Sequence, residues 1–195
     1  MYKSHILRSF LQKMSQHSGV QLLDLGSVCG PNLEFFARQG FKIFAEDILA
    51  NLRPPPALPP RMRTQRRRKK KIEMPAIQPF LHPDEKFQGV LCWDVFDFLD
   101  REEATLLAQE VYRVLAPGGF ALNFFNSRKV ESAELLYRYR ILDPDSLDYS
   151  QTGTRRLIRY SYQNRDIMQI FGKFRIESFF YLRNRMREVL TCKAA

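Results

Sequence analysis

The sequence predicts a doubly wound α/β fold, with a mostly parallel sheet of seven strands, helices on both faces and an antiparallel hairpin at the C-terminal end. Short apolar runs alternate with helical patterns through the first two-thirds of the chain, which is typical of a parallel sheet. Two later apolar runs, 174–182 and 186–192, are separated by only three residues, and so short a link requires antiparallel pairing. We expect a single domain over residues 1–195, because this length and a hydrophobic content of 45% suit one substantial core.

The first unit of this fold is a strand, a glycine loop, a helix and a second strand. An amphipathic helix with apolar positions in residues 6–14 precedes the unit. Residues 20–25 form a nearly continuous apolar run, which indicates a strand buried on both faces. Pro31 suits the first turn of the next helix and Gly40 suits its C-terminal end. Residues 41–45 are then expected to form the second strand.

Further along the chain, three apolar runs predict three more strands. We expect a weak strand near residues 75–80, a central strand at 87–93 and another strand at 120–125. Asp100 and Glu103 have the spacing of a capping box and predict the start of the helix between the last two of these strands. A last helix is expected over 162–171, and the C-terminal hairpin follows it.

Residues 51–75 interrupt this order, and we expect them to be a flexible insertion. Five prolines between positions 54 and 60 exclude a regular helix or a central strand, and the basic run behind them cannot be buried. Nine basic and no acidic residues lie between Arg53 and Lys71, so subtracting them from the formal charge of +10 leaves +1 for the rest.

Three interpretations of the insertion stay open. The basic run could bind nucleic-acid phosphates or anionic lipid head groups, the prolines could form a polyproline II ligand, or the segment could be a solvated loop. In a eukaryote, Arg66–Lys71 would also serve as a nuclear import signal.

The remaining composition excludes several classes of protein. The three cysteines are far apart and lack C-x-x-C spacing, which argues against a disulfide framework or a zinc site. None of the three histidines has a second ligand at metal-binding spacing, so we expect no metal. The sequence contains no run of 18 apolar residues and no apolar signal segment, and we expect a cytoplasmic protein without a membrane span.

Residues 22–30, Leu-Leu-Asp-Leu-Gly-Ser-Val-Cys-Gly, resemble the first motif of class I S-adenosylmethionine-dependent methyltransferases of the type 11 kind. That motif is an apolar strand ending in Asp-x-Gly-x-Gly-x-Gly, and Val28 stands here in place of the middle glycine. Its tight turn lets main-chain N–H groups and a helix N-terminus approach the amino-acid portion of the cofactor, which a β-branched residue hinders. Alternatively, the two glycines merely connect strand to helix. The resemblance implies S-adenosylmethionine as cofactor, held by Asp24, Gly26, Ser27 and Gly30.

Asp47 is the candidate acid for the cofactor's ribose. It lies 23 positions after Asp24 at the end of the second predicted strand, close to the spacing at which a carboxylate meets ribose hydroxyls. A carboxylate accepts hydrogen bonds from both vicinal hydroxyls with charge assistance. Glu46 is the alternative holder of this role, and an ordinary exposed acid at a strand end is the other explanation.

Residues 87–95 resemble the fourth strand of the same family, and residues 115–120 resemble its corner from helix to fifth strand. The family's mechanism is in-line attack of a substrate nucleophile on the sulfonium methyl group, without a covalent enzyme intermediate. Asp94 and Asp97 follow the fourth strand, where a base or a substrate-orienting acid could stand, and Asp94 would also approach the cofactor. Alternatively, the two acids cap the next helix with Asp100.

Three further segments bear on the substrate or the cofactor. The (Asp/Asn)-Pro-Pro-(Tyr/Phe) signature of enzymes that methylate amino groups of nucleic acids is missing after residue 93. Its absence argues against a nucleic-acid amino group as the substrate. Many relatives place an acid against the adenine amino group in the segment 77–81, where Gln78 is the nearest polar substitute. The family builds its substrate cover over 126–160, where aromatic and basic residues could hold an acidic or aromatic acceptor. The aromatic and basic residues of this segment are Arg128, Tyr137, Arg138, Tyr139, Arg140, Tyr149, Arg155, Arg156 and Arg159. The alternative interpretation of the segment is an ordinary solvated helical lid.

The sequence therefore predicts a cytoplasmic enzyme that transfers a methyl group from S-adenosylmethionine to a small-molecule or other biosynthetic acceptor. The first alternative is a non-catalytic module of the same fold that acts through its basic insertion. The second is a methyltransferase directed to RNA.

Overall fold

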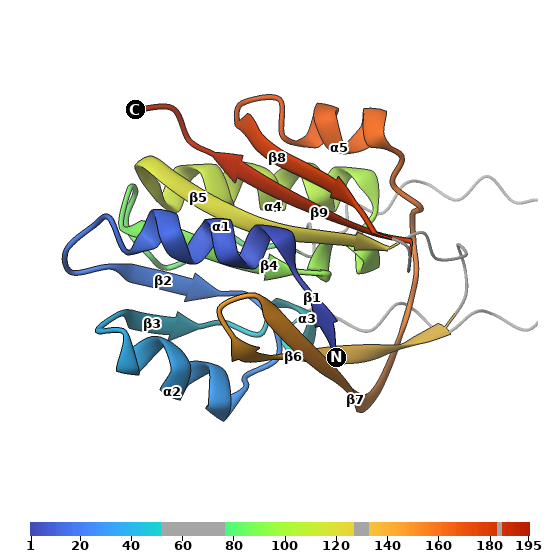
Figure 1. Ribbon diagram of the computed structural model, residues 1–195. Coiled ribbons are helices and arrows are strands. Elements are labelled where there is room, and N and C mark those ends of the chain that lie inside the picture. Colours follow the sequence, from blue (N-terminus) through green and yellow to red (C-terminus); the bar gives the residue numbers. More distant parts are fainter. Residues whose placement is uncertain (52–76, 127–132, 183–184) are drawn as a thin grey trace, which may run out of the picture.

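The main sheet of the protein has six strands, and a smaller sheet of three strands lies near the carboxyl ends of two of them (Figure 1). The computed structural model describes residues 1–51, 77–126, 133–182 and 185–195, and these counts refer to them. The order of the main sheet is β3-β2-β4-β5-β9-β8, parallel over the first four strands and antiparallel over the last two. The strands are β2 (Gln21–Asp24), β3 (Lys42–Ala45), β4 (Phe87–Trp93), β5 (Leu115–Asn126), β8 (Arg175–Tyr181) and β9 (Met186–Cys192).

Helices cover both faces of this sheet, because apolar side chains alternate between its faces. In β2, Leu22 belongs to the hydrophobic cluster formed with α1 (His5–Met14) and α2 (Gly30–Arg38). The adjacent Leu23 belongs to the cluster on the other face, formed with α4 (Arg101–Val114) and α5 (Asn164–Ile170). This period of two buries both sides of a central strand. The predicted doubly wound α/β class is confirmed.

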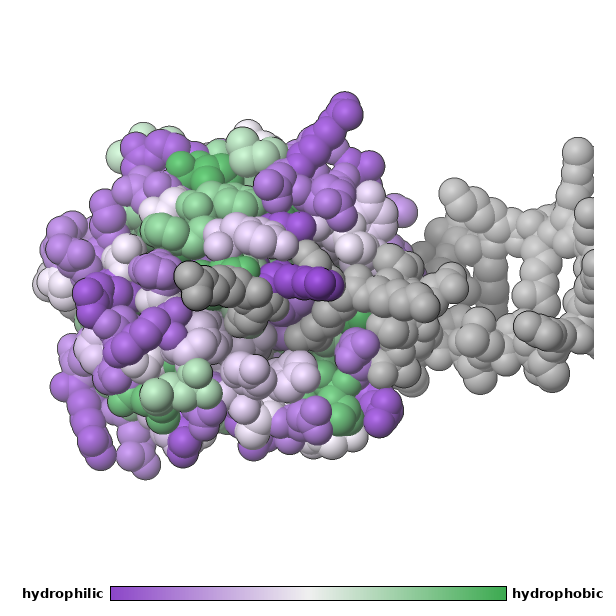
Figure 2. All heavy atoms as spheres, turned by 45° about the vertical axis from the view of Figure 1, so that its right-hand side comes forward, coloured by the Kyte–Doolittle hydropathy of each residue, from purple (hydrophilic) through white to green (hydrophobic). Residues whose placement is uncertain are grey.

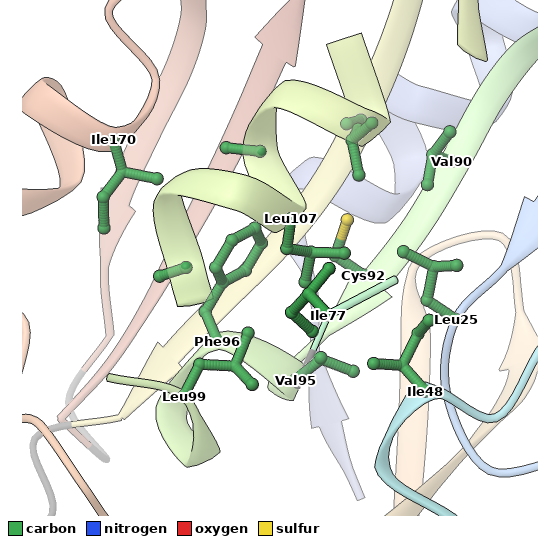
Figure 3. Close-up of a cluster of buried hydrophobic side chains, with 14 of the residues drawn as sticks. Leu25, Ile48, Ile77, Val90, Cys92, Val95, Phe96, Leu99, Leu107 and Ile170 are labelled. Carbon is green, nitrogen blue, oxygen red and sulfur yellow. The ribbon is translucent and has the colours of Figure 1, made fainter. Parts of the chain in front are cut away.

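The cluster beneath α4 is continuous with the ends of the parallel strands (Figure 3). Cys92 of β4 lies next to Leu107 of α4 in this view, and Val90 of β4 belongs to the same cluster. Ile48, at the start of the short helix α3 (Ile48–Asn51), and Val95, in the 3-10 helix η1 (Val95–Phe98), extend the cluster towards the sheet edge. The turns after β3 and β4 are therefore anchored by their own apolar residues, which fixes the polar residues beside them.

The local signals that predicted helix ends are also present in the structure. Asp100 and Glu103 form the capping box of α4, in which each side chain accepts from the other residue's main-chain N–H. Gly40 has a φ of +76°, the left-handed conformation that ends α2 and that side-chain-bearing residues rarely adopt.

The strand predicted near residues 75–80 is wrong for the described part of that segment. Residues 77–80 form an irregular loop, and the main sheet has six strands among the described residues where seven were expected. Pro79 cannot donate to a ladder, and the main chain of Phe80 bonds to α4 instead. The Phe80 N–H donates to Glu110 over 2.9 Å, and Arg113 donates to the Phe80 carbonyl over 3.0 Å.

A helical lid over residues 126–160 is likewise wrong. β6 (Ala133–Asp143) and β7 (Ser146–Leu157) form an antiparallel hairpin, and β1 (Tyr2–Lys3) pairs with β7 as the third strand of the small sheet. Between Arg138 and Leu142, exposed and buried residues alternate, which suits a half-buried strand and not a helix. We call residues 133–157 the cover hairpin.

The face turned to the viewer in Figure 2 is mostly hydrophilic, and its hydrophobic residues gather in several small patches. Among the described residues, none of the helices is both long and apolar enough to cross a membrane. The basic insertion, Arg53 to Lys71, lies outside the described residues.

Candidate cofactor site

Three acids predicted from the sequence lie at one edge of the main sheet. Asp24 is the last residue of β2, Asp47 lies two positions beyond β3, and Asp94 directly follows β4. These three strands are parallel neighbours, with Asp24 paired to Ala45 on one side and to Leu91 on the other. The carboxyl edge of parallel strands is where open α/β sheets bind ligands.

Asp24 is a buried acid with two hydrogen-bond donors on one oxygen. It is 2% exposed, and its Oδ1 accepts from the Gly26 N–H over 3.0 Å and from Trp93 Nε1 over 2.7 Å. Burial raises the pKa of Asp24 to about 6, and the charge of Asp47 adds to this rise against the two hydrogen bonds. Asp24 is therefore an acid whose charge is only partly compensated by the protein.

The loop after β2 is open at its helical end. A Cβ added to Gly30, the first residue of α2, would meet no heavy atom within 4 Å. Ser27 is partly buried, whereas Val28 is 49% exposed. The branched side chain at position 28 therefore has solvent on one side, and it does not belong to either of the two buried clusters.

The other end of the loop is covered by Trp93, which sequence reasoning missed. A Cβ on Gly26 would lie 2.4 Å from Trp93 Cδ1 and 3.0 Å from Nε1, so only glycine fits beneath this indole. The ring of Tyr139, from β6, stacks on the indole at 5.3 Å between centroids and 3° between planes. Trp93 is the only tryptophan of the chain and ends β4, and these two features were the available signals.

Asp47 and Glu46 have different partners. Asp47 Oδ1 accepts from the Ala50 N–H over 2.9 Å and so caps α3, while the carboxylate stays close enough to Asp24 to influence its pKa. Glu46 Oε1 lies 2.7 Å from Nε2 of His82. Arg156 of β7 donates to the Leu49 carbonyl and interacts electrostatically with Asp47. The cover hairpin thus reaches the acid predicted to meet the ribose.

Asp94 and Asp97 are both buried but face different neighbours. Burial raises the pKa of the Tyr2 hydroxyl, and the charges of Glu188 and Asp94 raise it further, so the Asp94 carboxylate lies near Tyr2 of β1. Asp97 accepts from the main-chain and side-chain N–H groups of Asn126, the latter over 2.8 Å.

The alternative role of Asp94 and Asp97, capping the next helix together with Asp100, is not found in the structure. The cap of α4 consists of Asp100 and Glu103, and Asp97 instead ties η1 to the end of β5 through Asn126. Asp94 is the first residue before η1, and its side chain makes no capping hydrogen bond there.

Gln78 is exposed in the loop of residues 77–80. The neighbouring Ile77 packs into the cluster that holds Ile48 and Val95, as Figure 3 shows. Gln78 is therefore placed near the ends of β3 and β4, in a loop and not in the expected strand.

The cover hairpin is fastened to α2 by Asn32, a second residue that sequence reasoning missed. Its Nδ2 donates to the Tyr139 carbonyl over 2.9 Å, and its Oδ1 accepts from the Ile141 N–H over 2.8 Å. Asn32 is 1% exposed, so both hydrogen bonds are shielded from water. A polar residue on the buried side of α2 was the only available signal.

The arginines of the cover segment are largely engaged within the protein. Arg140 pairs with Asp148 over 3.1 Å, and Arg159 pairs with Asp100 and Glu103 over 2.8 Å each. Tyr139 belongs to the predicted set and stacks on Trp93, the residue that covers Gly26. Arg128 lies outside the described residues.

Comparison with known proteins identifies the family. The methyltransferase domain model matches residues 23–123, more than half of the chain. The chain belongs to the methyltransferase domain family. No curated protein matches it in sequence.

Solved structures of several methyltransferases share the fold. A SAM-dependent methyltransferase from Methanosarcina mazei has 19% identity and a TM-score of 0.56, with 100% of this chain and 98% of that chain covered. The 1,6-didemethyltoxoflavin-N1-methyltransferase of Burkholderia thailandensis has 14% identity and a TM-score of 0.53, covering 98% and 78%. A Clostridium acetobutylicum S-adenosylmethionine-dependent methyltransferase has 12% identity and a TM-score of 0.53, covering 97% and 91%. At these identities the likeness shows the fold.

S-adenosylmethionine is the cofactor of this family. The two ends of the glycine loop differ in the space that they leave for such a ligand. The open space at Gly30 and the exposed position of Val28 leave room at the start of α2, and Asp47 stands at the next strand end. At Gly26 the indole of Trp93 lies in contact with the loop. The candidate site is therefore open beside α2 and α3, whereas the Trp93 indole fills it beside β4.

Proposed function

We propose that the protein transfers a methyl group from S-adenosylmethionine to a small-molecule acceptor in the cytoplasm. The observation that carries this proposal is the position of Asp24, Asp47 and Asp94 at the carboxyl ends of the neighbouring parallel strands β2, β3 and β4, next to the cover hairpin, whose Tyr139 stacks on Trp93. The Burkholderia thailandensis relative, whose structure holds 1,6-didemethyltoxoflavin and S-adenosylhomocysteine, supports an acceptor of this size.

Each candidate residue has a part in this proposal. The cofactor supplies an activated methyl group on a sulfonium centre. Asp24, Gly26, Ser27 and Gly30 hold its amino-acid end, Asp47 accepts from its ribose, and Gln78 faces its base. Asp94 orients the acceptor or takes its proton, and Asp97 is a positioning residue that acts through Asn126.

The test is binding of S-adenosylhomocysteine, measured by isothermal titration calorimetry. We expect micromolar affinity for the wild-type protein. Asp47→Asn removes a charged acceptor and should weaken binding about tenfold. Glu46→Gln is the matched control, because Glu46 pairs with His82, and it should leave the affinity within about twofold. An unchanged affinity for Asp47→Asn together with weaker binding by Glu46→Gln would assign the ribose to Glu46.

A non-catalytic module of the same fold is the second candidate, and one contact favours it. The indole of Trp93 already covers Gly26 and donates a hydrogen bond to Oδ1 of Asp24. If this ring stays in place, the protein should show no binding of S-adenosylhomocysteine at millimolar concentration. The same calorimetric titration therefore separates the two candidates.

A further inference from the structure

We propose that Trp93 is the gate of the cofactor site: its indole holds the place over Gly26 that the amino-acid end of the cofactor requires, and it leaves that place when the cofactor binds. This inference rests on the proposed function and names the residue that sets cofactor affinity. It concerns the described residues of β2, β4 and β6 and the loop between β2 and α2.

The first step is steric. The indole touches the main chain of Gly26 so closely that even one added carbon would lie 2.4 Å from its Cδ1 atom. No ligand atom can enter between two groups in such contact. A ligand that approaches the Gly26 main chain therefore has to displace the ring.

The second step is chemical. The neutral indole N–H donates to Asp24 Oδ1 over 2.7 Å, and Asp24 is a buried carboxylate with a pKa of about 6 as a result of its burial. A cationic amino group forms a stronger, charge-assisted hydrogen bond with a carboxylate than a neutral donor does. Exchange of the indole for the ammonium group of the cofactor is thus favourable at Asp24, and the indole serves as a stand-in donor while the cofactor is absent.

The third step concerns what holds the ring. Trp93 has a φ of +48°, a left-handed conformation that is uncommon for a bulky residue and that marks local strain. The ring is held in this position by its hydrogen bond to Asp24, by a tilted contact with Phe124 and by the parallel stack with Tyr139. The strand of Tyr139 is in turn fastened to α2 by Asn32. Local strain at Trp93 favours a second position once the hydrogen bond to Asp24 is replaced. Departure of the indole would also free a face of Tyr139 beneath the cover hairpin.

Trp93 is its own reporter, because the chain contains no other tryptophan. Titration of the wild-type protein with S-adenosylhomocysteine should shift the fluorescence emission of Trp93 to longer wavelength, as the ring leaves its buried stack. The shift should follow the same saturation curve as the calorimetric signal. Saturable binding without any change in emission would overturn the gate while leaving the proposed function intact.

Two variants test the same step without relying on fluorescence. Trp93→Ala removes the competing ring and should bind S-adenosylhomocysteine roughly tenfold more tightly or better, because a hydrogen bond to a charged group no longer has to be broken. Trp93→Phe keeps a ring but lacks the donor and should fall between Trp93→Ala and wild type. Phe10→Leu is the matched control: Phe10 is a buried aromatic of the same cluster on α1, and its variant should bind within about twofold of wild type.

The outcomes separate the two proposals. Equal or weaker binding by both Trp93 variants would overturn the gate, with the cofactor site still supported by the wild-type affinity. If Trp93→Ala does not fold, the affinity of Trp93→Phe and the fluorescence emission of the wild-type protein test the gate. Absence of binding by wild type and by the folded variants would overturn the proposed function, and the gate with it.

Discussion

At the scale of the residue, the chemistry of the site depends on Asp24. Its carboxylate is buried at the end of a parallel strand, with a main-chain and an indole N–H as its donors. These donors only partly offset the cost of burial, so its pKa is raised to about 6. An acid held in this state favours a cationic ligand, which is the chemical reason for placing the amino group of the cofactor beside it.

The raised pKa of Asp24 has a measurable effect on stability. The folded pKa of about 6 lies above the unfolded value of about 3.9, so the folded state binds more protons between these values. Stability contributed by Asp24 therefore falls as pH rises from about 4 to about 6, by about 3 kcal/mol in total, and stays low above that range. Asp24→Asn should remove this fall, as measured by urea unfolding of both proteins between pH 4 and pH 7. Parallel curves for the two proteins would contradict the assignment.

At the scale of the element, the cover hairpin connects the small sheet to the cofactor site. Asn32 uses both ends of its amide to pair with the β6 main chain, in the way that a neighbouring strand would. Tyr139 supplies one of these two main-chain partners, and its ring stacks on Trp93. The position of the hairpin is thus set by one helix side chain and one ring stack.

We expect Asn32→Ala to lower the free energy of unfolding by about 2–4 kcal/mol, because two buried hydrogen bonds are lost and two main-chain groups are left without partners. Gln39→Ala, which removes an exposed side-chain hydrogen bond from the end of α2, is the control and should change it by at most about 0.5 kcal/mol. Urea unfolding gives both values, and limited proteolysis should show faster cleavage between residues 133 and 157 in Asn32→Ala. Similar values for the two variants would show that Asn32 does not fasten the hairpin.

The elements that sequence patterns predicted are those with local signals. The run 87–93 is a strand with the predicted bounds, and the capping box of Asp100 and Glu103 starts α4. The cover hairpin was missed although Tyr137, Tyr139 and Ile141 alternate with Arg138 and Arg140, which is a local strand signal. The rest of the hairpin has no such alternation, and its pairing with β1 and its contact with α2 are non-local.

The same distinction applies to the candidate site. Strand-end acids are visible in a sequence, so Asp24, Asp47 and Asp94 could be proposed. Trp93 and Asn32 act through partners 69 and 107 positions away, and a sequence pattern holds no information on those distances. Whether the predicted residues bind the cofactor stays a prediction.

At the scale of the whole molecule, charge is concentrated in one segment. Nine of the ten net positive charges belong to Arg53–Lys71, outside the described residues, while the rest of the chain has a formal net charge of only +1. An RNA-directed role would therefore depend on this segment. Deletion of residues 53–71 should abolish any salt-sensitive binding of RNA, measured by fluorescence anisotropy at increasing salt. If the protein still binds RNA after the deletion, the insertion is not its RNA-binding segment.

The central claim is that the loop from Gly26 to Gly30 and the acid at the end of β3 hold S-adenosylmethionine. A crystal structure of the protein grown with S-adenosylhomocysteine tests it most directly. We predict the amino-acid end of the ligand over Gly26, its ribose at Asp47 and the Trp93 indole displaced from the loop. Ligand bound elsewhere, or an indole still seated on Gly26 at saturating ligand, would contradict the account.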